Sequence, residues 1–181
     1  MSTALVPVAD GSEEIETVAI VDTLVRAGVT VTLASVTGAA SVKCSRGVVL
    51  TADALIDDCL AKEYDCIAVP GGMPGAKTIG ECTKFVEMLK AHKEAGKVYG
   101  GICAAPAVVL LPNGLLGSAP ATCHPGFAKE LENCSEERVV VDGKLVTSRG
   151  PGTAIEFALA LTTLLLGAEK AESVKGPMLV K

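Results

Sequence analysis

Apolar residues along the chain follow two different periods. Short apolar runs, which are typical of buried strands, alternate with longer segments in which apolar positions recur at helical spacing. Strands are predicted at 4–8, 29–36, 64–69, 97–101, 119–123, 137–141 and 144–148, a short strand or hairpin around 48–50, and helices at 82–95, 104–111 and 152–166. Strands that alternate with helices predict a doubly wound α/β fold, in which a mostly parallel sheet lies between two layers of helices.

The helix that follows the first strand has recognisable end signals. Asp10 or Ser12 is suited to cap its N-terminus, and Gly28 is suited to end it. Glu13 and Glu14 then fall in its first turn, where negative charge is favourable. We expect both of these side chains to be solvated.

The composition fits one such domain. The chain has 181 residues, so we expect residues 1–181 to form a single domain. Apolar residues make up 49% of the chain and aromatic residues only 3%, so the core must consist mainly of Val, Leu, Ile and Ala. That set suits strands that are buried on both faces.

Charge and hydropathy argue against several partners. The net charge is −5, and the absence of a basic stripe argues against nucleic acid as a main partner. No apolar run reaches the roughly 18 residues that mark a transmembrane helix. The first residues, MSTALVPVADGSEE, lack the basic start of a signal peptide. We therefore expect a cytoplasmic protein that does not bind membranes.

Seven cysteines are present, at positions 44, 59, 66, 82, 103, 123 and 134. Their odd number and the lack of a C-x-x-C pair argue against a disulfide framework and against a zinc site. We expect reduced thiols, most of them small buried core residues. The question is whether one of them has a special role.

Cys103 lies in an unusual local sequence. The stretch YGGICAAPAVVLL at 99–111 predicts a strand, a sharp turn at the cysteine and a helix, as in a nucleophile elbow. Such a turn exposes the sulfur at the edge of the sheet and directs the first helical N–H groups, from Ala104 on, toward it. The positive end of a helix favours a thiolate. The spacing alone leaves two readings open, a nucleophile and a buried core cysteine.

Glu16 and His124 are candidates for proton transfer. Glu16 lies on a nearly apolar helical face, where a carboxyl group needs a partner or a proton because burial raises its pKa. An exposed helix glutamate is the alternative. His124 precedes a proline at the end of a predicted strand, where a functional histidine and an ordinary loop histidine both fit. His92 lies in a charged helix end, and we expect it to be solvated.

Two glycine-rich turns complete the set of candidate motifs. PGGMPGA at 70–76 follows a buried strand, and glycine there allows a close approach of the backbone; an ordinary turn is the alternative. It is not a phosphate-binding loop, because no G-K-[ST] follows. SRGPGT at 148–153 predicts a tight turn into the last helix, with Arg149 available to bind a carboxylate.

The motifs of the chain, taken in order, resemble those of the ThiJ/PfpI superfamily, in the branch of the parkinsonism-associated protein deglycase. They are GSEEIETV at 11–18, RAG at 26–28, CSRG at 44–47, VPGGMPGA at 69–76, ICAAP at 102–106, HP at 124–125 and TSRGPGTAIEFALA at 147–160. The resemblance covers almost the whole chain. It implies a flavodoxin-like sandwich and a homodimer, and we expect the CSRG segment near the dimer interface.

The resemblance also implies roles for individual residues. Cys103 matches the reactive cysteine, and Glu16 matches the carboxylic acid that touches it. Gly72 and Ala104 match the backbone N–H donors that face the sulfur. The remaining matches are His124, for a nearby histidine, and Arg46 and Arg26, for basic residues near the dimer interface and the mouth of the site.

The chain departs from its relatives at two places. Gly100 and Gly101 stand where alanines are usual, which we expect to loosen the approach to the turn at Cys103. Cys123 stands where threonine is usual. Because Cys123 and His124 point to opposite sides of a strand, we expect Cys123 to be a core residue; a resolving thiol for Cys103 is the alternative.

Two branches of the superfamily do not fit the chain. The protease branch has a histidine directly after the nucleophile, where this chain has Ala104. The glutamine amidotransferases place an acid after their histidine, where this chain has Pro125 and Gly126.

The remaining set, a thiolate, a protonatable carboxyl group and two N–H donors, suits attack on a small reactive aldehyde. The resemblance thus implies a cysteine-dependent glyoxalase or protein deglycase that uses no cofactor and no metal. Its substrates would be methylglyoxal, glyoxal or their protein adducts. The competing hypothesis is a non-enzymatic redox sensor or redox-regulated chaperone that works through oxidation of Cys103.

Overall fold

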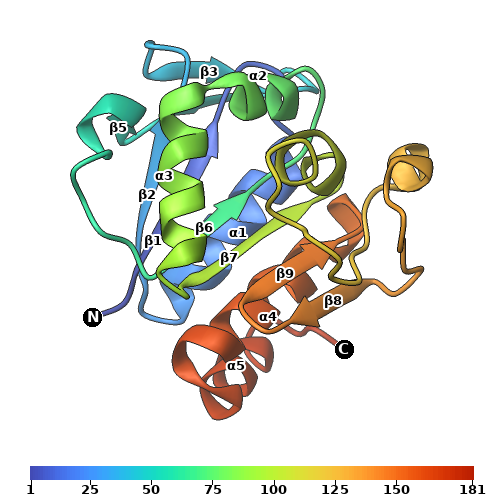
Figure 1. Cartoon of the computed structure of the whole chain (residues 1–181). Coiled ribbons are helices and arrows are strands. Elements are labelled where there is room, and N and C mark those ends of the chain that lie inside the picture. Colours follow the sequence, from blue (N-terminus) through green and yellow to red (C-terminus); the bar gives the residue numbers. More distant parts are fainter.

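A seven-stranded sheet forms the centre of the molecule (Figure 1). The computed structural model describes residues 1–181. All neighbouring strands of this sheet are parallel except β8 and β9. In spatial order the strands are β5 (Ala54–Leu55), β2 (Thr30–Ser35), β1 (Thr3–Val8), β6 (Cys66–Val69), β7 (Val98–Ile102), β9 (Leu145–Ser148) and β8 (Val139–Asp142).

Helices cover both faces of this sheet (Figure 1). One face carries α1 (Glu14–Arg26), α4 (Ala154–Leu166) and α5 (Ala168–Lys175), and the other carries α2 (Gly75–Glu81) and α3 (Thr83–Glu94). Short helical turns lie at Ile56–Asp58, Pro106–Leu110, Pro125–Glu130 and Pro151–Thr153, and a separate hairpin pairs β3 (Ser41–Lys43) with β4 (Val49–Thr51). The arrangement confirms the doubly wound, flavodoxin-like α/β fold. No helix combines the length and the apolar character needed to cross a membrane.

The core is divided by the sheet into two apolar clusters. Leu5 packs with the α3 residue Phe85 on one face, while its neighbour Val6 packs with Ile20 of α1 and Phe157 of α4 on the other. Successive strand residues point to opposite faces, and both faces are covered. The central strands are therefore continuous apolar runs in the sequence.

Three expectations about the elements were wrong. Residues 119–123 form no strand beyond an isolated bridge between Ala121 and Cys134, because the N–H of Thr122 donates to the Thr147 hydroxyl instead of to a neighbouring strand. The helix expected at 104–111 is present, but its bounds were wrong, because it forms a single π-type turn at Pro106–Leu110. Helices α2 and α5 were not expected, since neither has a long amphipathic repeat.

The N-terminal cap of α1 also differs from the expectation. Glu13 is the cap, and its side chain accepts a hydrogen bond from the N–H of Glu16 at 2.7 Å. Asp10 instead accepts from the N–H of Lys43, and Ser12 accepts from the N–H of Ala9. The other end is as expected, with Gly28 at φ +86° directly after the helix.

Gly100 is a tightly packed position rather than a loosened one. A Cβ there would overlap the Val146 carbonyl oxygen of β9 and come within 3.1 Å of the Phe157 ring. A Cβ at Gly101 would lie 3.2 Å from the Ala105 and Leu110 side chains. The room that an alanine would use at position 100 is taken by the neighbouring strand and by α4.

We predict that Gly100→Ala lowers the free energy of unfolding by about 1–3 kcal/mol, because the added methyl group forces β7, β9 and Phe157 apart. Gly152→Ala is the matched control, since a Cβ there meets nothing within 4 Å, and its change should stay within about 0.5 kcal/mol. Urea denaturation measures both. Equal stabilities of the two variants would contradict the packing argument.

Candidate active site

Cys103 lies in a sharp turn directly after β7. Its φ is +63°, in the left-handed region that residues other than glycine seldom adopt. The turn is held by backbone hydrogen bonds, from the N–H of Cys103 to the Ser148 carbonyl oxygen at 2.9 Å and from the N–H of His124 to the Cys103 carbonyl oxygen at 2.8 Å. Strained backbone maintained by its surroundings is typical of functional sites. The side chain is buried, with 9% of the residue exposed.

Two backbone N–H groups face the sulfur of Cys103. They belong to Gly72, in the turn after β6, and to Ala104, at the start of the helical segment after β7. The turn at Gly72 comes close to the backbone of Ser12 and Glu13, where a side chain would collide. The N–H donors expected from the sequence are therefore brought to the thiol by two different strand ends.

Glu16 points its carboxyl group at the Cys103 thiol from the first turn of α1. The residue is fully buried. Oε2 accepts a hydrogen bond from the N–H of Gly71 at 2.7 Å, and Oε1 is buried without a partner. A carboxylate with an unpartnered buried oxygen is costly, whereas a neutral acid can use its proton as a donor.

Gly71 is the residue that lets these groups meet. A Cβ at this position would lie 2.6 Å from the Cβ of Cys103, 2.9 Å from Oε2 of Glu16 and 2.9 Å from the Ile102 carbonyl oxygen. The carboxyl ends of β1, β6 and β7 converge here, where parallel sheets form their sites. The sequence predicted a close backbone approach in this turn, but it did not show that residue 71 is the one that lies beside both the Glu16 carboxyl group and Cys103.

The pKa values of Glu16 and Cys103 depend on burial and on each other's charge, and not only on the nearby helix end. Burial raises the pKa of Glu16 to about 7, against a lowering effect of the Gly71 N–H. Burial and the negative charge of an ionised Glu16 raise the pKa of the Cys103 thiol, while the N–H groups of Gly72 and Ala104 lower it. The Glu16 carboxyl group and the Cys103 thiol therefore compete for one proton. The thiol ionises more easily when Glu16 is protonated and neutral.

The first turn of α1 is covered, so the expectation that Glu13 and Glu14 are solvated was wrong. Both are buried, with 8% and 7% exposed. Glu14 accepts hydrogen bonds from the Ser45 hydroxyl and from the N–H groups of Arg46 and Val48 at the tip of the β3–β4 hairpin. The hairpin is thereby fastened over the helix end that carries Glu16.

His124 lies next to the turn at Cys103, but its ring makes no hydrogen bond to the thiol. Nδ1 accepts a hydrogen bond from the N–H of Gly126 at 3.1 Å. This bond leaves the proton of the neutral ring on Nε2. The ring is exposed and can donate to a bound molecule, but it would lose the bond to Gly126 on accepting a second proton.

The two candidate arginines lie in different places. Arg46 is exposed at the tip of the β3–β4 hairpin, beside the covered end of α1. Arg26 lies in the last turn of α1 and is paired with Asp22 at 2.8 Å. About 15 Å of helix separates it from Glu16, so the structure does not bring Arg26 to the Cys103 site within one chain.

Three further expectations are settled by the side-chain contacts. His92 is buried rather than solvated, and its Nε2 lies 2.7 Å from the Val98 carbonyl oxygen, so burial lowers its pKa. Arg149 binds a carbonyl oxygen, that of Glu136, rather than a carboxylate. Cys123 is a core residue, as expected, with 1% exposed.

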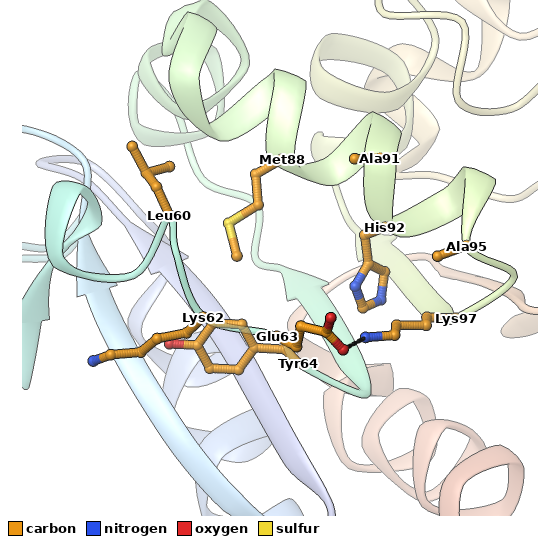
Figure 2. A pocket seen from close by; sticks show the side chains of 9 residues that line it. All are labelled: Leu60, Lys62, Glu63, Tyr64, Met88, Ala91, His92, Ala95 and Lys97. Carbon is orange, nitrogen blue, oxygen red and sulfur yellow. Dashed lines mark hydrogen bonds and ion pairs between the residues drawn. The ribbon is translucent and has the colours of Figure 1, made fainter.

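His92 and the Lys97–Glu63 ion pair line a pocket of about 240 Å³ (Figure 2). Its residues precede β6 and β7 in the chain, so it lies at the amino ends of these strands, opposite the Cys103 edge. It takes no part in the site. No group of three or more His, Cys, Asp or Glu side chains is placed to hold a metal ion.

Comparisons with known proteins identify the family of the chain. The model of the DJ-1/PfpI family matches residues 2–164. Protein DJ-1 homolog A of Arabidopsis thaliana is 49% identical over 169 residues, which are 92% of this chain and 43% of that protein. The chain thus spans less than half the length of this relative.

Two other matches extend over nearly the whole of both partners. Glutathione-independent glyoxalase DJR-1.2 of Caenorhabditis elegans is 36% identical over 93% of this chain and 91% of its own length. The structure of oxidised Toxoplasma gondii DJ-1 superimposes with a TM-score of 0.96 at 46% identity and covers 99% of both chains. The fold, the order of the motifs and these matches show that the chain belongs to the DJ-1/PfpI family.

Proposed function

We propose that the chain is a cysteine-dependent glyoxalase that needs no cofactor and converts small 2-oxoaldehydes, such as methylglyoxal and glyoxal, to hydroxy acids. The observation that carries the proposal is the buried Glu16 carboxyl group against the Cys103 thiol. The glyoxalase name of the Caenorhabditis elegans relative supports it.

The first step is addition of sulfur to the aldehyde. The thiol proton of Cys103 passes to Glu16, which adds no net charge to the buried site. The thiolate attacks the aldehyde carbon, a C–S bond forms, and the carbonyl oxygen becomes an oxyanion. The N–H groups of Gly72 and Ala104 stabilise this oxyanion. The proton held by Glu16 then passes to the oxyanion, which gives a hemithioacetal and returns Glu16 to the carboxylate.

The second step moves a proton between carbons. Glu16, as a carboxylate, takes the proton from the former aldehyde carbon and returns it to the adjacent carbon, which leaves a thioester. Water then hydrolyses the thioester to a hydroxy acid and the free thiol. The overall reaction adds one water molecule to the 2-oxoaldehyde to give the hydroxy acid, so no electron acceptor is consumed. The hemithioacetal hydroxyl loses its proton as the adjacent carbonyl oxygen gains one, and Nε2 of His124 donates a hydrogen bond to that oxygen while keeping its own proton.

The same chemistry extends to glycated proteins. Aldehydes form hemithioacetals and aminocarbinols with cysteine, lysine and arginine side chains, and these adducts release or present the same carbonyl carbon. Acting on them makes the chain a protein deglycase.

A redox role for the same cysteine is the second candidate. Peroxide would oxidise the Cys103 thiolate to a sulfinate, and the buried Oε1 of Glu16, which has no partner, could donate its proton to a sulfinate oxygen. A relative was solved in an oxidised form. In this reading the chain is a redox sensor or redox-regulated chaperone, and peroxide treatment changes its state without any turnover.

We predict that Cys103→Ser and pretreatment with peroxide each abolish methylglyoxal consumption by the purified chain. Glu16→Gln keeps an N–H donor at the thiol but cannot carry a proton, so turnover should fall by about 10²-fold or more while Cys103 is still alkylated readily. Glu16→Ala should impair both.

The matched control is Glu87→Gln, at an exposed position on α3, which should turn over like wild type. If Glu16→Gln also turns over like wild type, the proton is carried by another group, with His124 the next candidate. If wild type consumes no aldehyde while Cys103 oxidises readily, the redox role replaces the enzymatic one.

We also predict a pH-dependent stability difference caused by Glu16. Its pKa is raised from 4.5 to about 7 in the folded state, so between these values the folded chain keeps a proton that the unfolded chain has lost. The free energy of unfolding of wild type should therefore fall as pH rises through this window, by at most about 3 kcal/mol.

Because glutamine does not titrate, the stability of Glu16→Gln relative to wild type should increase from pH 4.5 to 7 and then level off. Chemical denaturation across this pH range measures it. A constant difference between the two proteins would show that Glu16 has the same pKa folded and unfolded.

We further propose that the chain is a homodimer through the outer face of α1 and the β3–β4 hairpin. Ile15, Val18 and Val25 on α1 and Val48 and Val49 on the hairpin are 48–60% exposed. Val18 and Val25 of α1 line one groove with Leu50 of β4, so the helix and the hairpin contribute to one exposed apolar surface, which is typical of an interaction site. Arg46 is exposed at the tip of the same hairpin.

Sedimentation should accordingly show a dimer at micromolar concentration. Val49→Glu should shift it to a monomer, because a buried unpaired charge is strongly unfavourable. Val141→Glu, at another exposed valine on the edge strand β8 (49% exposed, against 60% for Val49), should leave the dimer intact. A monomeric wild type would disprove the proposal.

A further inference from the structure

Two other cysteines, Cys123 and Cys134, lie side by side. The backbone around them forms a short parallel bridge between Ala121 and Cys134. The N–H of Ser135 donates to the Ala121 carbonyl oxygen at 2.7 Å, and that of Ala121 donates to the Asn133 carbonyl oxygen at 3.4 Å. Since alternate residues share a face, Cys123 and Cys134 are diagonal neighbours on one face of this bridge.

Both side chains pack in the apolar cluster that also contains Ala121 and Leu131, and Cys134 is near enough to raise the pKa of the Cys123 thiol. In the reduced state each Sγ donates to a backbone carbonyl oxygen, that of His124 at 3.4 Å for Cys123 and that of Ser135 at 3.7 Å for Cys134. Their surroundings differ in exposure. Cys123 is buried with 1% exposed, whereas Cys134 is half-buried on a surface segment. The pair therefore has one sulfur that a reagent from solution can reach and one that only its neighbour can reach.

A cation stands beside the buried member of the pair. Burial and the neighbouring Cys134 raise the pKa of the Cys123 thiol to about 12, and the Arg149 guanidinium offsets part of this rise. Nη1 of Arg149 donates to the Glu136 carbonyl oxygen at 2.8 Å, which fixes the charge between the two segments. A nearby cation stabilises the thiolate that a second thiol exchange needs.

We propose that Cys123 and Cys134 form a dithiol–disulfide site that a low-molecular-weight disulfide, such as oxidised glutathione, converts to an intrachain disulfide. The Cys134 thiolate attacks one sulfur of the oxidant, a mixed disulfide forms and one glutathione leaves. The Cys123 thiolate then attacks the Cys134 sulfur, and the second glutathione leaves. The two protein thiols lose two electrons and two protons, and two molecules of reduced glutathione carry them away.

The backbone has the freedom that this bond requires. A disulfide needs Cα atoms about 4.4–6.8 Å apart, so one of the two segments must be able to shift to reach this distance. Residues 132–135 belong to no strand of the main sheet and are tied to Ala121 by the two backbone bonds alone. A small hollow of about 60 Å³ beside Ala121, Leu131 and Asn133 leaves room for that shift.

The site is separate from the proposed reaction of Cys103. Cys123 directly precedes His124 in the chain, and the N–H of His124 donates to the Cys103 carbonyl oxygen. Neither Cys123 nor Cys134 takes part in the proposed aldehyde chemistry. The full chain with Cys103→Ser therefore isolates it. Failure of the disulfide would leave the glyoxalase proposal untouched, and failure of the glyoxalase proposal would leave the disulfide untouched.

The test is incubation of wild type and Cys103→Ser with oxidised glutathione, followed by alkylation, trypsin digestion and mass spectrometry. Cleavage after Lys129 separates the two cysteines, so a bonded pair appears as one two-chain peptide that lacks two hydrogens. We expect Cys123 and Cys134 to lose alkylation together in both proteins, so that the number of alkylated thiols in Cys103→Ser falls by two. Addition of a dithiol reductant should restore them.

Single variants distinguish the two roles within the pair. Cys123→Ser should stop at the mixed disulfide and keep glutathione on Cys134, and Cys134→Ser should give no linked peptide. Cys82→Ser removes another half-buried cysteine and should leave the link unchanged. Glutathione that accumulates on Cys134 of the wild type, a link from Cys123 to Cys103, or no reaction at either sulfur would overturn the proposal. The wild-type result and Cys134→Ser decide the matter even if Cys123→Ser does not fold.

Discussion

The contact between the Glu16 carboxyl group and Cys103 exists only because residue 71 has no side chain. Three strand ends meet at this point, and a single methyl group on Gly71 would lie 2.6 Å from the Cys103 Cβ and 2.9 Å from Oε2 of Glu16, too close for either atom to keep its place. The N–H of the same residue holds Oε2 of Glu16 at 2.7 Å. One glycine thus supplies both the space for the pair and the hydrogen bond that orients it.

The chemistry of the pair depends in turn on the exclusion of water from the end of α1. Glu14 fastens the β3–β4 hairpin over this end, and Glu13 caps the helix while its own N–H binds the Gly71 carbonyl oxygen. Burial then raises the pKa of Glu16. The hairpin that closes the site also carries the exposed valines of the proposed dimer face, so assembly and the environment of Glu16 share one structural element.

The cysteines illustrate how strongly surroundings decide the behaviour of one residue type. Cys103 has a neighbouring acid and two N–H donors, whereas Cys66 is enclosed by apolar side chains, and burial raises the pKa of its thiol. Cys123 and Cys134 face each other beside Arg149. The sequence alone does not distinguish the seven cysteines. Their packing makes one a candidate nucleophile, places others in the core and brings Cys123 and Cys134 together as a pair.

The sequence by itself determined the features that depend on near neighbours in the chain. The alternation of apolar runs with helical spacing specifies the α/β fold, and the short strand that ends in Gly100, Gly101 and Ile102 before the cysteine specifies the turn at Cys103. Gly28 ends α1 as expected, because a left-handed residue after a helix is a local requirement.

The tertiary structure decided what depends on residues far apart. Glu13 and Glu14 are buried because a hairpin about 30 residues away folds over them, and His92 is buried because its ring reaches the Val98 carbonyl oxygen across the turn into β7. Gly100 is tight because β9 and α4 fill the space beside it. Burial and hydrogen-bond partners are properties of the folded chain, so a local sequence pattern cannot specify them. The pKa of Glu16 and the pairing of Cys123 with Cys134 depend on these properties, and the tertiary structure therefore decides them too.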